Sequence, residues 1–399
     1  MLEGLLVTTV LLGIGAVFYS YALYPFVLFV VAAFHQAARD AAFVFRKAER
    51  RKAEPEDAAD WPLVAVVISA YNEERHLAAR IDNLLALDYP ADKLVAYIGS
   101  DGSRDRSPEI LARYADEPRI KGFAFEQNRG KANVLNDLVS RGTEPLLVFS
   151  DANTFFRPDA LKKLVAGFAD PRVGGVSGEL RLMGTGGDNQ DSLYWRIEQF
   201  LKFFEARLGA LLGANGAIYA IRRSLWKPLR PDTICDDFCV AMNVSAAPAR
   251  LLYEPRAWAE EDTPERIDEE FKRRVRIGIG NFQALMRHPE YLLRTSTATR
   301  FAYLSHKVLR WIAPHLLILA LVASSVLAID SLFWRCFTAA HWLAFLGSAA
   351  ALWATNRGVK LPKLVKLVAF IYALNWAFLV ASWRYATGRY GGAWARSSR

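Results

Sequence analysis

The sequence has few of the residues and motifs that mark several common protein classes. Only three cysteines occur among its 399 residues, Cys235, Cys239 and Cys336, which excludes the disulfide framework of a small secreted protein. No CxxC pair or ladder of Cys and His is present, which argues against a structural zinc site. The GxxxxGKS/T loop is absent and no GxGxxG follows the first expected strand, so a P-loop nucleotidase and a dinucleotide-binding domain are both disfavoured.

Charge is absent from residues 5–34 and nearly absent from residues 311–329, 332–354 and 367–385. Each run reaches about the 20 residues that a membrane-spanning helix needs. The first run could instead be a cleaved signal peptide, but its apolar core is too long and Glu3 is its only charged flank. We therefore expect a retained N-terminal membrane helix and about three C-terminal ones.

Basic residues beside these runs set the expected orientation. They follow the first run and separate the third run from the fourth, and the positive-inside rule places both stretches in the cytoplasm. Four crossings then leave the basic C-terminal tail outside, so a re-entrant or interfacial position for one run stays open. The basic residues are Arg39, Arg46, Lys47, Arg50, Arg51 and Lys52 in the first stretch and Arg357, Lys360, Lys363 and Lys366 in the second.

Composition and charge bound the remaining possibilities. Apolar residues make up 53% of the chain and charged residues 23%, which excludes global disorder. The net charge of +9 fits nucleic acid, anionic lipid or a phosphorylated substrate, but the membrane topology accounts for part of it, so we expect no nucleic-acid partner. The expected divisions are a membrane helix (1–34), a basic cytoplasmic linker (35–60), a soluble domain (61–290), an interfacial helix (291–310), about three membrane helices (311–386) and a basic tail (387–399).

Short β-branched runs alternate with helical patterns in the soluble domain. This alternation predicts an α/β fold, with a mainly parallel sheet and helices on both of its faces. In such sheets, ligands bind beyond the carboxyl ends of the strands, where this sequence has Asn72, Glu73, Asp101, Asp151 and Asn153. Strands are predicted over 63–69, 94–98, 121–126 and 145–149, and helices over 77–87, 108–115 and 131–140.

Two of these strand ends carry candidate ligands. Asp151 and Asn153 put two oxygen-bearing side chains on one side of an extended segment. Hard oxygen ligands of this kind suit Mg²⁺ or Mn²⁺ that bridges a diphosphate, although a helix cap before Pro158 explains the same residues equally well. Asp101 followed by Gly102 is, in isolation, a strand-ending turn.

Three further positions carry charge in unusual settings. Lys131 opens a helix after Gly130, which either binds an anion or exposes a lysine to solvent. Asp236 and Asp237 are adjacent and flanked by apolar residues, so they are either a general base with its neighbour or a solvent-facing pair at a helix start. Three arginines crowd one helical turn and either clamp a diphosphate or form a solvated face: Arg273, Arg274 and Arg276.

Two other stretches have no assigned chemistry. A helix expected over 193–212 has a broad apolar face that fits either membrane headgroups or the protein core. Residues 184–187 are predicted to be a flexible loop.

Seven short motifs occur in a fixed order between the first membrane run and the later ones: SAYNEE, DGSRDRS, GKANVLN, DAN, GANGAIYAIRR, DDF and RRVRI. No single motif is specific, but the ordered set over residues 63–277 resembles the membrane-bound family 2 glycosyltransferases with a GT-A catalytic domain. Bacterial exopolysaccharide glycosyltransferases are the nearest resemblance, and hyaluronan, chitin and cellulose synthases are more distant ones.

The resemblance implies an enzyme that transfers a sugar with inversion from a nucleotide-sugar, commonly a UDP-sugar, with Mn²⁺ or Mg²⁺ as cofactor. It implies that Asp237 deprotonates the acceptor, beside Asp236, and that Asp151 and Asn153 hold the metal. It assigns the nucleotide-sugar to Ala70, Tyr71, Glu73, Asp101, Lys131, Asp151 and Arg276. It assigns the acceptor and sugar pocket to Asn215, Gly216, Ala217 and Arg273.

The sequence departs from the family pattern at two positions. Asn153 replaces the second carboxylate of the usual DxD motif, which keeps an oxygen ligand but loses a charge. The late Q/RxxRW motif keeps Arg273 and Arg276, but Ile277 replaces the tryptophan that lies near the acceptor sugar in processive relatives. With only about four membrane helices, this departure favours single sugar additions over a processive polymerase with a wide channel.

Three functions remain in view. The first is an inverting transferase of exopolysaccharide or cell-envelope glycan synthesis at the bacterial inner (cytoplasmic) membrane, with its catalytic domain in the cytoplasm and a lipid-linked or saccharide acceptor. The second is a processive synthase that also exports its polymer, and the third is a catalytically inactive membrane partner. A transporter is disfavoured because the membrane runs carry few polar groups. Membrane lipids and other polysaccharide-biosynthesis proteins are the further expected partners.

Overall fold

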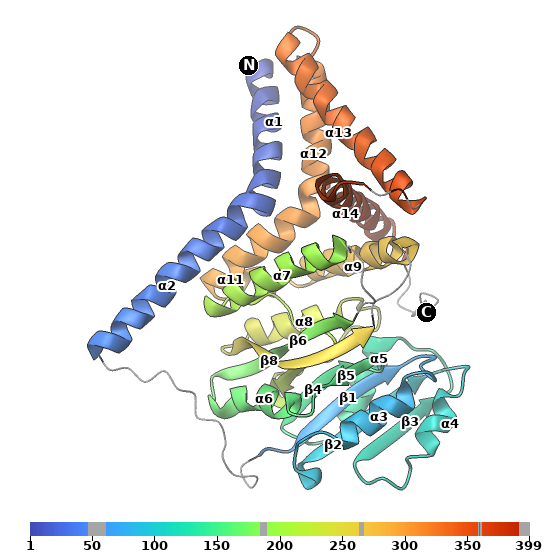
Figure 1. Cartoon of the computed structure of the whole chain (residues 1–399). Coiled ribbons are helices and arrows are strands. Elements are labelled where there is room, and N and C mark those ends of the chain that lie inside the picture. The colour runs from blue at the N-terminus through green and yellow to red at the C-terminus, as the bar shows by residue number, and fades with distance from the viewer. Residues whose placement is uncertain (47–60, 184–189, 263–266, 358, 360, 391–399) are drawn as a thin grey trace.

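The computed structural model describes residues 1–46, 61–183, 190–262, 267–357, 359 and 361–390. In Figure 1 an α/β unit lies at one end of the molecule, and long helices extend away from it at the other. The predicted loop at 184–187 falls outside the described residues, as do residues 47–60 of the expected linker and 391–399 of the expected tail.

One eight-stranded sheet organises the α/β unit, in the order β3-β2-β1-β4-β7-β6-β8-β5. The first four strands along the chain are parallel to one another, and β6 is parallel to β8. β7 is antiparallel to both β4 and β6, and β5 is antiparallel to β8. The predicted α/β fold with a mainly parallel sheet is confirmed. The strands are β1 (Val64–Ala70), β2 (Leu94–Asp101), β3 (Ile120–Phe125), β4 (Leu146–Asp151), β5 (Thr154–Phe156), β6 (Val173–Met183), β7 (Tyr219–Arg222) and β8 (Arg250–Asp262).

Both faces of the sheet are covered, as the composition of β1 requires. Every residue of β1 is buried, and its alternate side chains point to opposite faces. Val66 and Ile68 join a core with α3, α4 and α6, whereas Ala65 and Val67 join a second core with α5 and α8. These helices are α3 (Leu77–Leu85), α4 (Ser107–Ala112), α5 (Lys131–Ser140), α6 (Ala160–Ala166) and α8 (Asp236–Ser245), with short 3₁₀ turns at η3 (Ala91–Lys93), η4 (Gly167–Ala169) and η5 (Arg223–Leu225).

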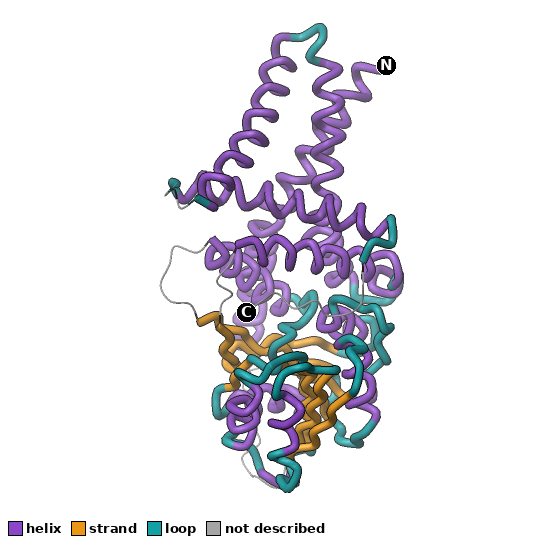
Figure 2. Tube along the Cα trace, turned by 90° about the vertical axis from the view of Figure 1, so that its right-hand side faces the viewer, coloured by secondary structure: helices purple, strands orange, loops and turns teal. Residues whose placement is uncertain are grey.

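The second core continues from the sheet into the helices that extend from it. It contains Leu201 of α7 (Gln190–Arg207), Ile279 of α9 (Ile267–Arg287), and Trp311 and Ala381 near the ends of two membrane-type helices. Because one buried cluster includes residues of both parts, the α/β unit and the helical part pack directly against each other. Figure 2 shows this contact from a second direction.

Four helices within the described residues are long and apolar enough to cross a membrane, by length and composition. This finding confirms the four predicted runs. The spans are Leu2–Phe45, Thr297–Leu327, Leu332–Thr355 and Leu364–Ala386. They comprise α1 (Leu2–Phe18) and α2 (Tyr24–Arg46), then α12 (Leu309–Leu327), α13 (Leu332–Asn356) and α14 (Lys363–Ala386).

α1 packs along α12, as Figure 1 shows. Gly13 allows the two backbones to approach closely, because a Cβ atom there would lie 2.9 Å from the carbonyl oxygen of Leu316. Small residues at such positions are typical of helix pairs in membranes, where close backbone contact replaces the hydrophobic effect as the main source of attraction.

The first helix differs from the prediction, which ended it at residue 34. It continues to Arg46, because residues 35–46 contain no glycine or proline that would end it. A π-helical turn, η1 (Tyr19–Leu23), bends the helix next to Pro25. Pro25 has no N–H to donate to the preceding turn, which accounts for the irregular hydrogen bonding there. Figure 1 shows α2 leaving the direction of α1 at this point.

The single helix expected over 291–310 is divided in the structure. A short α10 (Glu290–Leu293) comes first, and α11 (Thr297–Ala302) follows after a break. Ser296 caps α11 by accepting the N–H of Thr299 at 3.1 Å, so its hydroxyl replaces the missing helical partner. A second π-helical turn, η6 (Tyr303–Val308), then leads into α12. The location of this segment at the membrane surface stays a prediction.

Candidate functional site

The carboxyl ends of β1, β2 and β4 meet at one edge of the sheet, as their parallel arrangement requires. Ala70 ends β1 and pairs with Ser100 of β2, while Ser69 pairs with Asp151 at the end of β4. Tyr71 follows Ala70 and is partly exposed. The polar clusters predicted at these three strand ends therefore lie side by side.

Hydrogen bonds join the loops that follow β1 and β2. Asn72 donates its N–H to Ser103 Oγ (3.0 Å) and accepts the N–H of Arg104 at its Oδ1 (2.8 Å). Glu73 donates its N–H to Ser107 Oγ (3.0 Å). Asn72 has a φ of 54°, in the left-handed region that asparagine tolerates better than most residues. These bonds hold the SAYNEE and DGSRDRS motifs in one fixed arrangement.

Asp101, which the resemblance assigns to the nucleotide, uses both carboxylate oxygens within the fold. Its Oδ1 accepts the N–H of Arg129 and its Oδ2 accepts the N–H of Gly130, each at 2.8 Å. The neighbouring Gly102 must be glycine, since a Cβ atom there would lie 2.4 Å from the backbone nitrogen of Asn128. Asp101 therefore fixes the start of α5, and its contact with a nucleotide stays a prediction.

Lys131, the first residue of α5, joins two acidic residues from different elements. Its Nζ lies 2.9 Å from Asp151 Oδ1 at the end of β4 and 3.2 Å from Asp236 Oδ2 at the start of α8. Burial by itself lowers the pKa of Lys131, but the carboxylates of Asp151 and Asp236 outweigh burial and hold this pKa well above its usual value. Lys131 is therefore a fixed positive charge between the DAN and DDF motifs.

Asp237 lies in the first turn of α8. Burial raises the pKa of its carboxyl to about 6 and Asp236 adds to the rise, while Lys131 opposes it. The N–H of Phe238 also opposes the rise by donating to Asp237 Oδ1 at 2.8 Å. A pKa near neutrality suits a group that accepts a proton during a reaction. The pair does open a helix, as one interpretation held, but Asp236 is only 8% exposed and does not face bulk solvent.

The loop before β7 brings the predicted acceptor residues to the same place. Gly216 lies against Asp237, since a Cβ atom at Gly216 would be 3.0 Å from Asp237 Oδ2. Ala217 is buried, and its carbonyl oxygen accepts the hydroxyl of Ser150 at 2.8 Å. Asn215 is 7% exposed. The GANG motif thus borders the acidic pair, which is what a pocket for the transferred sugar or its acceptor requires.

α9 runs past the start of α8 and carries the arginines of the RRVRI motif. Gly280 of α9 permits the close approach, since a Cβ atom there would lie 2.5 Å from Cys235 Sγ. Burial raises the pKa of the Cys235 thiol well above its usual value, and Arg276, one helical turn before Gly280, opposes that rise. Arg276 and Arg273 are both exposed. Cys235 and Cys239 are buried free thiols.

Asp151 and Asn153 are the predicted metal ligands, and their oxygens are hard donors of the kind that Mg²⁺ and Mn²⁺ bind. Asn153 donates its Nδ2 to Glu261 Oε1 at 2.9 Å, a contact that orients the amide. Among the residues that the structure describes, no three His, Cys, Asp or Glu side chains are grouped closely enough to hold a metal by themselves. Asp151 and Asn153 therefore fit a divalent metal as two of its oxygen ligands, and such a metal would offset the charge of a bound diphosphate.

Arg80, which the sequence reasoning missed, lies behind Asp151. It is fully buried on α3, donating Nη2 to Ser150 Oγ (3.0 Å) and Nη1 to Asn83 Oδ1 (2.6 Å). Burial lowers the pKa of Arg80 to about 9, and Asp151 opposes that fall. The available signal was an arginine on the apolar face of its helix, which requires a buried partner.

Lys202 of α7 was missed as well. Its ammonium donates to Asn215 Oδ1, so α7 contacts the loop that borders the acidic pair. Burial lowers the pKa of Lys202 to about 8 and Lys307 adds to the fall, while Asp237 opposes it. The signal in the sequence was a lysine within the otherwise apolar stretch FLKFF.

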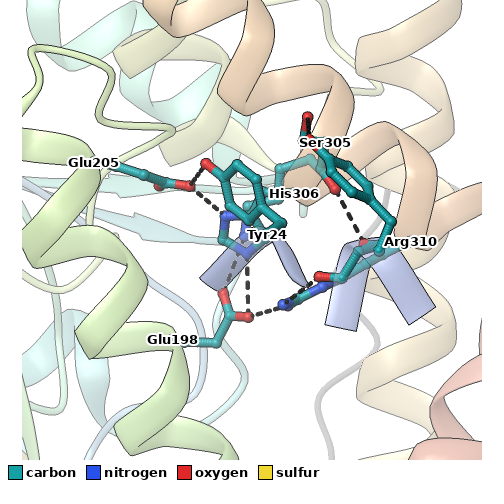
Figure 3. A network of polar contacts seen from close by, with 9 residues as sticks. Tyr24, Glu198, Glu205, Ser305, His306 and Arg310 are labelled. Carbon is teal, nitrogen blue, oxygen red and sulfur yellow. Dashed lines mark hydrogen bonds and ion pairs between the residues drawn. The ribbon is translucent and has the colours of Figure 1, made fainter. Parts of the chain in front are cut away.

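A group of polar side chains, here named the membrane-junction network, links α7 to the membrane-type helices (Figure 3). Glu198 lies 2.7 Å from Arg310 Nη1 and 3.1 Å from Lys307 Nζ. Glu205 Oε1 accepts the hydroxyl of Tyr24 at 2.9 Å and lies 2.7 Å from His306 Nδ1. The network comprises Tyr24, Glu198, Glu205, Ser305, His306, Lys307 and Arg310.

The chain is similar in sequence and in fold to several known glycosyltransferases. Residues 65–227 match the family model described as "Glycosyl transferase family 2". The chain is 28% identical over 231 residues to the poly-beta-1,6-N-acetyl-D-glucosamine synthase of Staphylococcus epidermidis, covering 56% of each protein. It is 26% identical over 239 residues to the synthase of the same name from Staphylococcus aureus (strain COL), again covering 56% of each. The match thus spans about half the length of these curated relatives.

A solved structure resembles nearly the whole chain. The mannosyltransferase PcManGT from Pyrobaculum calidifontis, in complex with GDP-Man and Mn²⁺, matches with a TM-score of 0.69 and 21% sequence identity. The match covers 98% of this chain and 100% of that one. The shared fold therefore includes the helices outside the α/β unit as well as the sheet.

Proposed function

We propose that this chain, which contains a glycosyltransferase family 2 domain at residues 65–227, is a membrane glycosyltransferase. It transfers one sugar, with inversion, from a nucleotide-sugar to a lipid-linked or saccharide acceptor in exopolysaccharide or cell-envelope glycan synthesis. The observation that carries the proposal is the position of Lys131 between Asp151 and Asp236, with Asp237 beside them. It joins the expected donor side and the expected acceptor side of the reaction in one cluster.

The chemistry follows from the charges in this cluster. The acceptor oxygen attacks the anomeric carbon as its proton passes to the carboxylate of Asp237, and the bond from that carbon to the donor diphosphate breaks. The pKa of Asp237, raised to about 6, leaves it mostly deprotonated at neutral pH and basic enough to take the proton. Lys131 keeps its positive charge near the departing diphosphate, where it stabilises the charge that develops.

The proposed metal site is formed by Asp151 and Asn153. A bound Mn²⁺ or Mg²⁺ would supply further positive charge to the leaving diphosphate. Arg276 on α9 is proposed to contact the same diphosphate, while Ala70, Tyr71 and Glu73 border the nucleotide. Asn215, Gly216, Ala217 and Arg273 are proposed to shape the acceptor side.

The donor is proposed to be a UDP-sugar. The curated relatives are synthases of an N-acetylglucosamine polymer, and the solved PcManGT structure contains GDP-Man. Both nucleotides therefore belong in the first assay. The chain is proposed to lie in a bacterial inner membrane with its α/β unit in the cytoplasm, because basic residues such as Arg39 and Arg357 follow the first and third uncharged runs of the sequence, 5–34 and 332–354.

A processive synthase that exports its polymer is the second candidate, because the curated relatives are named as synthases. Ile277, in place of the tryptophan of processive relatives, argues for the first candidate. Product length separates the two. Long chains formed at low turnover per enzyme would support the synthase, and single additions would support the transferase.

The test is nucleotide release by the detergent-purified full-length chain, with Mn²⁺ or Mg²⁺, a panel of UDP- and GDP-sugars, and total membrane lipid as acceptor. Metal-dependent release with one donor is expected, and the donor identifies the sugar. Binding of UDP and GDP is measured in parallel. A chain that binds a nucleotide but releases none from any donor would contradict the transferase and favour an inactive membrane partner.

A further inference from the structure

Lys202 reaches the acidic pair through a short, well-fixed loop. Its ammonium donates to Asn215 Oδ1. Asn215 is held in turn on β6, because its N–H donates to Ser177 Oγ (3.0 Å) and its Nδ2 donates to the carbonyl oxygen of Gly178. All the polar groups of the Asn215 side chain are therefore engaged within the protein. The position of the loop depends on β6 on one side and on α7 on the other.

The next residue of this loop touches the proposed base. Gly216 lies so close to Asp237 that a Cβ atom would be 3.0 Å from Oδ2. Lys202 and Asp237 thus contact the adjacent residues Asn215 and Gly216, and the charge of each side chain favours the charged form of the other. A lysine here opposes the burial that disfavours the ionised form of the Asp237 carboxyl.

Titratable groups from several elements face these two side chains, and Asp237 also interacts with Tyr219 of β7 and with the thiols of Cys235 and Cys239. Asp236 on α8 disfavours the ionised form of Asp237, while Lys131 of α5 and Lys202 of α7 favour it. Around Lys202, Lys307 disfavours the charged ammonium, whereas Asp237 and two glutamates of its own helix favour it. The two glutamates are Glu198 and Glu205.

The same two glutamates fix α7 to the membrane-type helices. Positions 198, 202 and 205 are four and three residues apart, so their side chains share one face of the helix. Glu198 pairs with Arg310 and Glu205 with His306, and the Glu198 side chain is 13% exposed while that of Glu205 is fully buried (Figure 3). Lys202 therefore projects from a helix that is bound on either side of it to the membrane part of the molecule.

We propose that Lys202 is a positioning residue for Asp237, supplying the positive charge beside its carboxylate and holding the Gly216 loop against it, while the membrane-junction network holds Lys202 in place. The assignment of Asp237 as the base rests on the proposed function, whereas the effect of Lys202 on the Asp237 carboxyl does not. Because α7 is fixed by the membrane helices, the charge at the base depends on residues far from it in the sequence.

The experiment measures the protonation of Asp237 directly, without a substrate. The full-length protein in detergent is treated with a carbodiimide and an amine nucleophile between pH 4.5 and 8, and modification of Asp237 is quantified by peptide mass spectrometry. Only the protonated carboxyl reacts, so the midpoint reports its titration. In Lys202→Met the midpoint should rise by about half to one pH unit, because a favourable charge is lost. Lys202→Arg should restore the wild-type midpoint.

Three comparisons make the result decisive. Lys121→Met, which removes an exposed lysine of β3, should leave the midpoint unchanged. An unchanged midpoint in Lys202→Met overturns the proposal. So does an equal shift in Lys202→Arg accompanied by a lower Tm, since that result means that the loop has collapsed.

Turnover is measured separately, once a donor is known. The acid limb of the kcat/KM profile should move with the labelling midpoint, with donor KM unchanged. If the wild-type chain turns over no donor, but the labelling midpoint of Asp237 still rises in Lys202→Met, the proposed function is contradicted and the role of Lys202 is supported.

Discussion

The ammonium of Lys131 lies 2.9 Å from Asp151 Oδ1, which joins the first residue of α5 to the last residue of β4. The same ammonium lies 3.2 Å from Asp236 Oδ2. Three motifs that are separate in the sequence therefore share one charge. A change at Lys131 therefore alters the electrostatic environment of three acidic residues: Asp151, Asp236 and Asp237.

Replacing Lys131 with methionine should abolish most of the activity. The positive charge near the leaving diphosphate is lost, and we expect turnover to fall by about 100-fold or more, the usual effect of removing one electrostatic stabiliser. Nucleotide binding should weaken as well. Turnover is measured by nucleotide release, and nucleotide binding is measured by calorimetry. Lys162→Met is the matched control, since it removes a partly exposed lysine that pairs with the exposed Asp88. Turnover within two-fold of wild type in Lys131→Met would contradict the proposed role.

Replacing Asp237 with asparagine should remove the base and leave nucleotide binding intact. Turnover is expected to fall by about 100- to 10,000-fold, the range for loss of a general base. Asp116→Asn, at an exposed position, should behave as wild type. A fully active Asp237→Asn variant would show that another group accepts the proton.

The raised pKa of Asp237 predicts how activity and stability depend on pH. In the wild type, kcat/KM should fall about tenfold per pH unit below pH 6, because the base is then protonated. The folded pKa lies above the ordinary value of 3.8, so the folded state favours the protonated carboxyl. That favourable contribution to stability is complete below about pH 4 and is lost as the pH rises through 6. Asp237→Asn should therefore raise Tm at pH 7 more than at pH 5, and an equal gain at both would contradict this interpretation.

The Gly216→Ala variant tests how closely the Gly216 loop must approach Asp237. An added Cβ atom would lie 3.0 Å from Asp237 Oδ2, so Gly216→Ala must move the loop or the carboxylate by a few tenths of an ångström. We expect turnover to fall by about tenfold with little change in Tm, since misplacement of reacting groups is costly even when the fold is kept. Gly347→Ala is the control, because nothing lies within 4 Å of a Cβ atom at that position. Wild-type turnover in Gly216→Ala would separate the loop from the reaction.

The Asn153→Asp variant tests the proposed metal site while it keeps an oxygen ligand at position 153. Asn153→Asp restores a second carboxylate, so the Mn²⁺ concentration for half-maximal turnover should fall several-fold. The same change replaces the donor to Glu261 with a like charge, so Tm without metal should fall and Tm with Mn²⁺ should recover. Chelation should abolish the turnover of both proteins. An unchanged metal requirement in Asn153→Asp would place the metal elsewhere.

The membrane-junction network predicts a stability effect far from the reacting groups. Glu198→Gln leaves Arg310 and Lys307 without their carboxylate partner at a buried site, and we expect Tm to fall by several degrees. Combining it with Arg310→Met should recover part of the loss, since the unpaired charge is then removed as well. Glu117→Gln, which removes a surface pair with Arg119, should change Tm little. Equal losses of Tm in Glu198→Gln and Glu117→Gln would mean that the membrane-junction network stabilises the protein no more than a surface ion pair does.

Local sequence determined the elements of this protein. The β-branched run at 64–70, the apolar stretches without charge and the glycine before Lys131 each fixed a strand, a membrane-type helix or a helix start by short-range chemistry. The parallel order of the strands followed from their alternation with helices, and with it the meeting of the polar clusters at one sheet edge. The continuation of the first helix to Arg46 was missed because the amphipathic segment after residue 34 no longer has the composition of a membrane span.

Only the tertiary structure decided which charges meet. Asp101 and Lys131 are both predicted to contact the donor, and only packing shows that the oxygens of Asp101 accept backbone N–H groups and that Lys131 lies between two acids. Glu198 and Arg310 are 112 residues apart, and no local pattern connects them. Arg80 and Lys202 stand out in the sequence only as charges among apolar residues, and their partners depend on burial, which gives a charge its energetic weight and is a property of the whole fold and not of a segment.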